Sequence, residues 1–410
     1  MMYRHLCLIS STIASMLLAS CTPQPSFPHF EGLTPITVPS DAGGQPNLFA
    51  HHDQLYLSWV EYLNDTTDVL MWTQLESENQ WAQPREVTRG HNWFVNWADF
   101  PSLAVFADGH TMAAHWLQMH GEGTYEYDVH IAISHDGGHS WPIEFVPHRD
   151  SIAAEHGFVT LLPRPDNQMQ AFWLDGRQTP DGGPMTVRTA VFDSLGRLSE
   201  EALVDSRTCD CCQTDAVWTS SGPLAAWRDR SPEEIRDIFT SYNTAQGWAE
   251  PLAVHHDGWL IAGCPVNGPA LAAHGQQVVI VWFTMADNEA RVQAAFSSDG
   301  GRQWSEPMRL DTGQALGRVD VVWLPDRQGA MATWLQQVPN AQDEAPGGKI
   351  MARFFDSSGH MSELFALAES DPSRQSGFPI LARVDKRIYL AWTAVTDQGT
   401  QVRTAKVKLR

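Results

Sequence analysis

The stretch Val279-Ile280-Val281-Trp282 is the clearest copy of a pattern that recurs along this chain, a short apolar run that ends on tryptophan. The tryptophans that end the copies are Trp59, Trp116, Trp173, Trp227, Trp282, Trp334 and Trp392. Successive members of this series are 52 to 58 residues apart. A period this regular indicates that one supersecondary unit is repeated along the whole chain.

Each tryptophan run lies second in a unit of four short apolar stretches separated by turn residues. In the second unit, 101–105 precedes the turn Asp108-Gly109, and 129–133 follows the tryptophan run. The last stretch of a unit begins after a Trp and a Pro, as in Trp248-Ala249-Glu250-Pro251. Four short strands per unit with almost no helical periodicity are typical of the blades of a β-propeller.

The two ends of the chain complete the count. The seventh unit stops at Arg410 after its third strand, and 33–39 is the segment that could supply the missing one. We therefore predict an all-β chain that forms a seven-bladed propeller, its last blade closed by an N-terminal strand. The alternative is six blades and an additional sheet.

Two hairpin turns carry a motif that resembles a known family. Ser134-His135-Asp136-Gly137-Gly138-His139-Ser140-Trp141 and Ser297-Ser298-Asp299-Gly300-Gly301-Arg302-Gln303-Trp304 both fit Ser-x-Asp-x-Gly-x-x-Trp. This pattern resembles the Asp-box, or BNR repeat, of sialidase-like β-propellers. The aspartate caps the turn through its own backbone, and glycine tolerates positive φ. The resemblance implies the fold, with a structural role for the motif at the outer edge of the blade.

Resemblance to sialidases also implies a possible chemistry, hydrolysis of terminal sugars. Members of that family have a Phe-Arg-Ile-Pro-type segment near the first blade and three arginines that hold a carboxylate. They also have a Tyr nucleophile paired with a Glu, and an Asp that acts as acid and base. Here Gln45-Pro46-Asn47 stands where the first segment is expected. Because of this departure, an exo-acting glycoside hydrolase with a diverged site is an alternative hypothesis.

The N-terminal residues read as an export signal. Arg4 is followed by the apolar run 6–18, which is too short to span a bilayer, and then by Leu18-Ala19-Ser20-Cys21. This ending resembles the lipobox of bacterial lipoproteins, which implies a signal peptide at 1–20 and lipidation of Cys21. An ordinary secretory signal is the alternative. We read 21–32 as a Pro-rich tether and 33–410 as a single propeller domain, held in the cell envelope at the outer membrane and facing the periplasm or the cell surface.

The chain is strongly acidic. It has 27 basic and 48 acidic residues, and loss of 1–20 removes only Arg4, which leaves a net charge of −22. Such a surface argues against nucleic acid and anionic lipid headgroups as partners. We expect a monomer that meets the membrane only through its lipid and whose ligand is a small molecule or a glycan.

The cysteines left after processing are the most unusual chemical feature. Cys209, Cys211 and Cys212 lie together at the entrance to the fourth blade, and Cys264 lies at the entrance to the fifth. With His156 they could bind zinc or copper(I), because thiolates suit both ions; Cys209, Cys211 and Cys264 are the central members of this set. A disulfide between the two blades and a redox-active pair are the alternatives, since an exported compartment permits disulfides.

Other polar residues gather at the blade entrances, where propellers bind ligands near the axis. Candidate acid, base and anion-holding groups are Asp99, Asp320 and Arg318, and candidate ligand-binding residues are Trp97, Glu155, Asp215, Asn267 and Arg374. We read Asp229 and Asp237, with the arginines around them, as a solvated ion-paired loop. The leading hypothesis is a ligand-binding or metal-binding module, followed by a glycoside hydrolase and by a platform for protein interactions.

Overall fold

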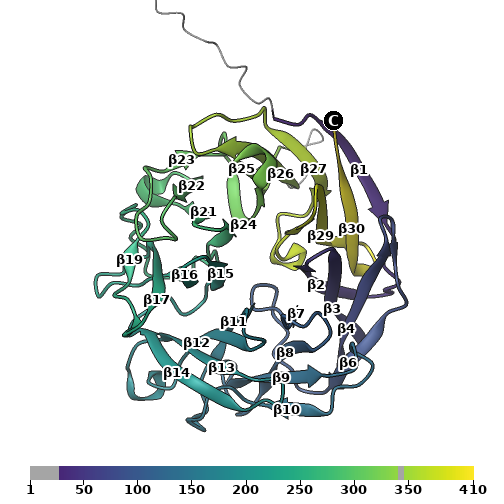
Figure 1. Cartoon of the computed structure of the whole chain (residues 1–410), viewed down its shortest axis with the longest axis vertical. Helices are drawn as coiled ribbons and strands as arrows, with labels where there is room; N and C mark the ends of the chain where they lie inside the picture. The colour runs from purple at the N-terminus through teal and green to yellow at the C-terminus, as the bar shows by residue number, and fades with distance from the viewer. Residues whose placement is uncertain (1–26, 340–345) are drawn as a thin grey trace, which may run out of the picture.

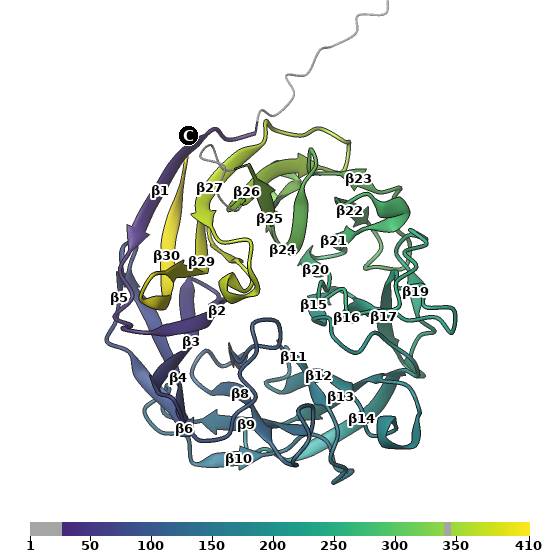
Figure 2. The same cartoon turned by 180° about the vertical axis from the view of Figure 1, so that it is seen from behind.

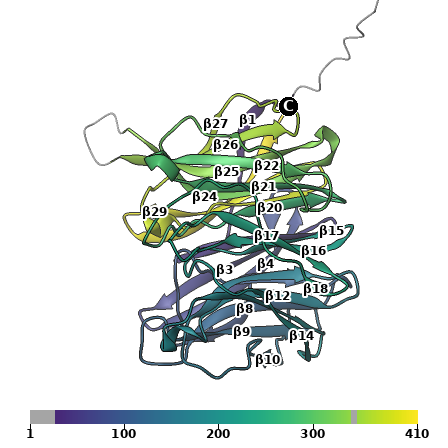
Figure 3. The ribbon, with the colours of Figure 1, turned by 90° about the vertical axis from the view of Figure 1, so that its left-hand side faces the viewer.

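The computed structural model describes residues 27–339 and 346–410. Seven antiparallel sheets are arranged in a ring around a common axis (Figure 1), and the chain passes through them in order. A cavity lies along this axis, and we call it the central channel. Seen from behind, the first strands of the blades again lie nearest the middle (Figure 2). From the side, the sheets of successive blades stack face to face (Figure 3). The predicted seven-bladed, all-β fold is confirmed, and the six-bladed alternative is wrong.

The strands follow the repeat. Blade one contains β2 (Gly43–His51), β3 (Gln54–Asn64), β4 (Thr67–Ser77), β5 (Gln80–Trp81) and β6 (Arg85–Gly90). Blade two contains β7 (Ser102–Val105), β8 (Met112–Met119), β9 (Tyr127–Ser134) and β10 (Ile143–Phe145). Blade three contains β11 (His156–Pro163), β12 (Met169–Asp175), β13 (Thr186–Phe192) and β14 (Leu198–Asp205). Blades four and five contain β15 (Asp215–Thr219), β16 (Gly222–Arg228), β17 (Ile238–Thr244), β18 (Gly247–Trp248) and β19 (Leu252–Ala253); and β20 (Ala270–His274), β21 (Gln277–Thr284), β22 (Arg291–Ser297) and β23 (Met308–Arg309).

Blades six and seven complete the ring. They contain β24 (Ala315–Leu324), β25 (Gly329–Val338), β26 (Gly347–Asp356) and β27 (Phe365–Ser370); and β28 (Ile380–Val384), β29 (Arg387–Thr396), β30 (Gly399–Leu409) and β1 (Phe30–Ile36). Four short 3-10 turns, η1 (Thr179–Asp181), η2 (Ala286–Asn288), η3 (Pro325–Arg327) and η4 (Arg374–Ser376), are the helical elements of the described residues. Within those residues, no helix has the length and apolar character needed to cross a membrane.

The repeated tryptophans lie in the second strand of each blade and fill the space between neighbouring sheets. Five of them are at most 1% exposed. Their indole N–H groups donate to side-chain oxygens of Glu61, Asp175, Asp205, Asp257 and Gln336. A buried indole needs such an acceptor, so each tryptophan combines a large apolar contact with one fixed hydrogen bond.

The ring is closed by the N-terminal strand, as the sequence predicts. β1 pairs antiparallel with β30, with Leu33 opposite Val407 and Ile36 opposite Thr404. The strand begins at Phe30 rather than Leu33, so it includes the end of the predicted tether. The predicted signal peptide and Cys21 lie outside the described residues.

The Asp-box turns connect the third and fourth strands, and their hydrogen bonds explain the motif. Asp136 Oδ1 accepts the backbone N–H groups of His139 and Ser140, both at 2.9 Å. Asp299 accepts the equivalent groups after β22, both at 3.0 Å. Gly138, at φ 76°, lies so close to the first blade that a Cβ would come 2.1 Å from a ring carbon of Trp72. The motif therefore serves the turn and the blade contact.

Candidate functional site

The cysteine stretch lies just before β15, and Gln213 and Thr214, which follow it, line the cavity in the central channel; we call this end of the cavity the channel mouth. Gln213 reaches across the ring: its Nε2 donates to the carbonyl of Ala98 at 2.5 Å, and its Oε1 accepts the N–H of Gly268 at 3.0 Å. A Cβ on Gly268 would stand 2.1 Å from the Gln213 carbonyl oxygen. The entrances of blades two, four and five are therefore in direct contact, and this contact holds the cysteine stretch in place.

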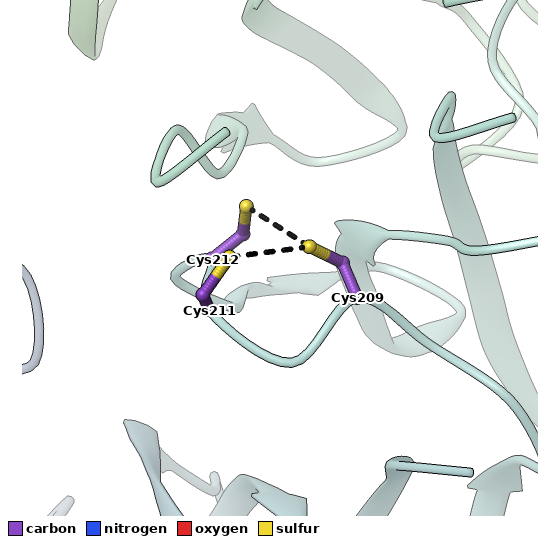
Figure 4. A group of neighbouring side chains, drawn as sticks. All are labelled: Cys209, Cys211 and Cys212. Atoms are coloured by element: carbon purple, nitrogen blue, oxygen red, sulfur yellow. Dashed lines mark hydrogen bonds between the residues drawn. The ribbon is translucent and has the colours of Figure 1, made fainter. Parts of the chain in front are cut away.

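Three sulfur atoms converge in this stretch. Cys209 Sγ lies 3.6 Å from Cys211 Sγ and 3.4 Å from Cys212 Sγ, and the three side chains point toward one another (Figure 4). Cys209 and Cys212 are each 1% exposed, whereas Cys211 is half-buried. All four cysteines of the described chain are free thiols here.

Cys264 approaches the same place from the next blade entrance. Its Sγ, Cys211 Sγ and a carboxylate oxygen of Asp210 all lie within 4.8 Å of one another. Cys264 itself is exposed. Cys211 is thus common to two groups of potential ligands, a buried one and a more accessible one, which places the sequence-predicted cysteines together.

Arg236 is the residue of this site that the sequence did not reveal. Its Nη1 donates to Cys209 Sγ at 3.1 Å and to Asp210 Oδ1 at 3.3 Å. The prediction of a solvated loop here is wrong, because Arg236 and Asp237 are each 3% exposed and Arg228 is 1% exposed. The sequence of this loop is rich in charged residues, and that composition does not indicate that Arg228 and Arg236 are buried.

Arg228 supplies a second buried positive charge beneath the cysteines. Its guanidinium donates to the backbone carbonyls of Asn267, Arg236 and Phe283 at 2.6 to 2.9 Å and lies 4.8 Å above the ring of Trp259. The charge of Arg228 also favours the thiolate of Cys212. Burying a guanidinium is unfavourable unless an anion compensates it, so this location suits negatively charged sulfur.

The four thiols differ in acidity. Burial opposes ionisation of Cys209, but hydrogen bonds from Cys211 and Cys212 and the charge of Arg236 together hold the pKa of Cys209 well below its usual value. Contacts with the other sulfurs raise the pKa of Cys211, and burial raises that of Cys212. A hydrogen bond from Cys211 lowers the pKa of Cys264 to about 7. The site therefore holds one stabilised thiolate inside and one accessible thiol that ionises near neutral pH.

The sulfur spacing suits a bound metal ion. Two thiolates on one tetrahedral ion, each ~2.3 Å from it, lie about 3.8 Å apart. The spacings of 3.4 and 3.6 Å are close to this value. A disulfide instead requires ~2.05 Å, which would need rotation of one side chain. The residues therefore fit a soft metal such as copper(I) or zinc.

The predicted channel carboxylates join neighbouring blades. Asp99 accepts the N–H of Phe158 at 2.7 Å, Asp215 that of Leu271 at 2.6 Å and Asp320 that of Leu381 at 2.5 Å. These aspartates line a cavity of about 290 Å³ in the channel. Burial raises the pKa of each to about 7, more than their backbone hydrogen bonds lower it. Their oxygens are therefore already occupied in holding the ring together.

Glu155 and Asp99 share a tyrosine. The hydroxyl of Tyr127 lies 2.9 Å from Glu155 Oε1 and 3.0 Å from Asp99 Oδ2. One hydroxyl proton serves only one of them, so the other contact requires a protonated carboxyl. Burial raises the pKa of Glu155 to about 8, which fits this requirement. Tyr127 is fully buried, with its ring stacked 4.0 Å from that of Phe94, whereas Glu155 is half-buried.

The other predicted rim residues lie between blades six, seven and two. Arg318 Nη1 donates to Ser376 Oγ at 2.7 Å, and its guanidinium lies 4.7 Å above the ring of Trp97. Asn267 Oδ1 accepts the backbone N–H of Arg318 at 2.7 Å. Arg374 also lies over Trp97, at 5.8 Å, and is exposed. Arg318 and Asn267 therefore join the entrance segments, and Arg374 is the one of these residues that faces solvent.

Solved structures with a similar fold are known, although their sequences differ widely from this chain. No family model and no curated protein matches the chain. Among solved structures, the phage phi92 endosialidase is similar over 93% of this chain and 70% of its own, with 9% identity and a TM-score of 0.52. An α-L-arabinofuranosidase from Fusarium graminearum, in complex with an iminosugar inhibitor, is similar over 92% of this chain and 98% of its own, with 11% identity and a TM-score of 0.50. The chain has a sialidase-like β-propeller fold.

In this sialidase-like propeller, His156 does not join the cysteines. Its ring is fully buried, stacks 3.8 Å from that of His148, and has Nε2 3.4 Å from Asp150 Oδ2. The expectation that His156 is a ligand beside the thiols is therefore corrected: its ring belongs to a separate cluster between blades two and three. Arg177 lies 3.2 Å from Asp150 Oδ2, so a positive charge already stands beside the carboxylate that a cation would need there.

Proposed function

We propose that this protein is a binding module for a soft metal ion, copper(I) or zinc, held by Cys209, Cys211 and Cys212 at the channel mouth. The observation that carries the proposal is the convergence of three sulfurs with spacings of 3.4 and 3.6 Å. Thiolate ligands select these ions over hard cations. Two of the three sulfur-bearing residues are buried, which would protect the bound ion from competing ligands in solution.

The surrounding charge supports bound thiolates over a disulfide staple. Arg236 donates to Cys209 Sγ, and Arg228 lies buried beneath the same stretch. A disulfide is neutral and would leave the Arg228 guanidinium with carbonyl partners and the more distant Asp237 carboxylate. The charge of three thiolates exceeds that of one copper(I) or zinc ion, so the metal–thiolate group remains negative and is favourable beside the two arginines.

The test is metal and thiol analysis of the full chain, purified without oxygen. We expect copper(I) or zinc in stoichiometric amounts, and loss of that metal in Cys209→Ser and Cys212→Ser. The matched control is Cys264→Ser, which leaves the buried triad intact and should keep an ion there. Metal-free protein with two thiols missing from the titration would show disulfides and refute the proposal.

A second candidate function, glycoside hydrolysis, is favoured by one observation. Asp99 and Glu155 contact the same hydroxyl of Tyr127, and Glu155, which is half-buried, has its pKa raised by burial to about 8, so it is protonated near neutral pH. A protonated carboxyl can act as a general acid on a glycosidic oxygen. The burial of Asp99 and Tyr127 makes this the weaker candidate, because neither can touch a sugar without rearrangement.

A panel of fluorogenic glycosides, sialosides included, tests it. Turnover by the wild-type chain that is lost in Glu155→Gln, with the metal site intact, would establish hydrolysis. Absence of turnover on every member of the panel, in protein shown to be folded, would count against it.

We further propose that the module acts in the cell envelope, tethered through a lipid on Cys21. What supports this is the sequence alone, the apolar run and lipobox-like ending before that cysteine. Labelling with a fatty-acid analogue in cells should mark the wild type and fail to mark Cys21→Ser. Equal labelling of both would refute the anchor.

A further inference from the structure

Cys211 is shared by two sets of potential ligands. The first contains Cys209, Cys211 and Cys212, and the second contains Asp210, Cys211 and Cys264, with all ligand atoms of each set within 4.8 Å of one another. The four cysteines do not form one set at that distance, because Cys264 is joined to the others through Cys211. In a single tetrahedral site, all four sulfurs would lie about 3.8 Å from one another. The arrangement is therefore that of two adjoining positions with one common thiolate.

The local charges leave room for two positive charges. Four thiolates and Asp210 are five negative groups, and Glu234, which bonds to Arg230 and Arg236, is a sixth. Arg228, Arg230 and Arg236 are the positive groups beside them. Metal ligation requires the deprotonated thiolates, and with all four thiol protons displaced the group carries three excess negative charges. Two of the three arginines there are at most 3% exposed, so these charges are poorly screened. Two monovalent ions bring it within one charge of neutrality.

We propose that the channel mouth binds two copper(I) ions that share the Cys211 thiolate, an inner one on Cys209, Cys211 and Cys212 and an outer one on Asp210, Cys211 and Cys264. This rests on the proposed function, since it assigns the number and position of the ions at the same site. A single divalent ion on the inner three cysteines would supply the same charge but would leave Asp210 and Cys264 without an ion. A single ion on all four sulfurs would need them around one point, which the grouping does not provide.

The two positions differ in access. The inner set is closed by Cys209 and Cys212, each 1% exposed, whereas Cys264 of the outer set is exposed. An ion at the outer position can exchange with a ligand in solution directly, and an ion at the inner position must pass the shared Cys211. The outer ion should therefore leave first when a chelator is added.

The test is anaerobic loading of the full chain with copper(I), removal of excess ion, and native mass spectrometry with elemental analysis. We expect two ions in the wild type, one in Cys264→Ser, and one in wild-type protein treated briefly with a chelator. Glu234→Gln is the matched control: it changes the partner of Arg230 and Arg236 without removing a ligand, and it should keep two ions.

The outcomes separate the two proposals. One ion in the wild type that is retained in Cys264→Ser would overturn the second position and leave the proposed function standing. One copper ion lost equally in Cys264→Ser and Cys212→Ser would overturn it in favour of a single four-cysteine site. No ion in wild-type protein with free thiols would overturn both. Circular dichroism of each variant shows whether an ion was lost through unfolding.

Discussion

Arg236 provides the sharpest test of how the thiolate group is stabilised. Replacement of Arg236 with glutamine removes a guanidinium 3.1 Å from Cys209 Sγ while leaving a polar side chain in its place. Groups that bond to metal ligands typically change metal affinity by about 10- to 100-fold, which is about 1.4–2.8 kcal/mol. Because the Arg236 side chain is only 3% exposed, solvent screens its charge weakly, and we expect a loss of affinity near the upper end of that range.

Arg230→Gln is the control for this substitution. Arg230 has the same charge and also approaches Asp210, at 3.4 Å, but its side chain is 29% exposed and has no contact with a sulfur. Loss of such an exposed ion pair changes a free energy by ~1 kcal/mol or less, so we expect metal affinity to fall by at most about fivefold. The two variants therefore differ in contact with sulfur rather than in net charge.

The measurement is equilibrium competition for copper(I) against a chromogenic chelator, without oxygen and at matched ionic strength. Thermal unfolding followed by circular dichroism establishes that both variants are folded. Unchanged affinity in Arg236→Gln, or equal losses in both variants, would refute the view that a buried guanidinium holds the thiolate in place.

Three further predictions concern the ring. Burial raises the pKa of Asp320 to about 7, above the ~3.9 of an unfolded chain, so the folded state keeps a proton that the unfolded state releases. The free energy of unfolding should therefore fall as pH rises from about 4 to about 7, and in urea titrations Asp320→Asn should make that fall smaller, with Asp99 and Asp215 supplying the rest. Gly138→Ala should lower the free energy of unfolding by about 2–4 kcal/mol, because its φ is positive and the new Cβ would collide with Trp72. Gly359→Ala, at positive φ but with open space around it, should lower the free energy of unfolding by about 1 kcal/mol, and equal losses would contradict this account. Deletion of 31–40 should sharply lower the melting temperature, since it removes the strand that pairs with β30, and an unchanged value would contradict closure of the ring.

Much of the architecture could be predicted because it depends on local patterns. A tryptophan in each second strand and Asp-box turns after the third specify a blade without reference to other blades. The closing strand was also predictable, because a seventh unit that lacks its fourth strand needs an edge partner.

The candidate site was predictable in part. The sequence places Cys209, Cys211 and Cys264 at adjoining blade entrances. In the structure Cys211 is close to both of the others, but Cys209 forms its set with Cys212 and Cys264 forms its set with Asp210. The directions of His156 and Arg236 did not follow, because residue type and spacing do not say which way a loop side chain turns. His156 is the first residue of β11, and its ring packs against that of His148 between blades two and three.

The backbone at the entrances explains why these directions could not be predicted. Phe158, Val266 and Arg318 have φ values of 53°, 51° and 56°, which bulky and β-branched residues seldom adopt. Such conformations persist only when the surrounding structure imposes them. Here the imposing contacts come from neighbouring blades, such as the hydrogen bond from the Phe158 N–H to Asp99.

By itself, the sequence determined the number of blades, the strand order and the turn chemistry, because these depend on residues near one another in the chain. Only the tertiary structure decided which groups face the channel mouth: Cys211 between two sets of ligands, Arg236 against sulfur, and Asp320 against the next blade. The reason is that the mouth is built from several entrance loops that pack on one another around the axis. At Phe158, Val266 and Arg318 the backbone takes a conformation that the residue itself disfavours and that contacts within the ring stabilise.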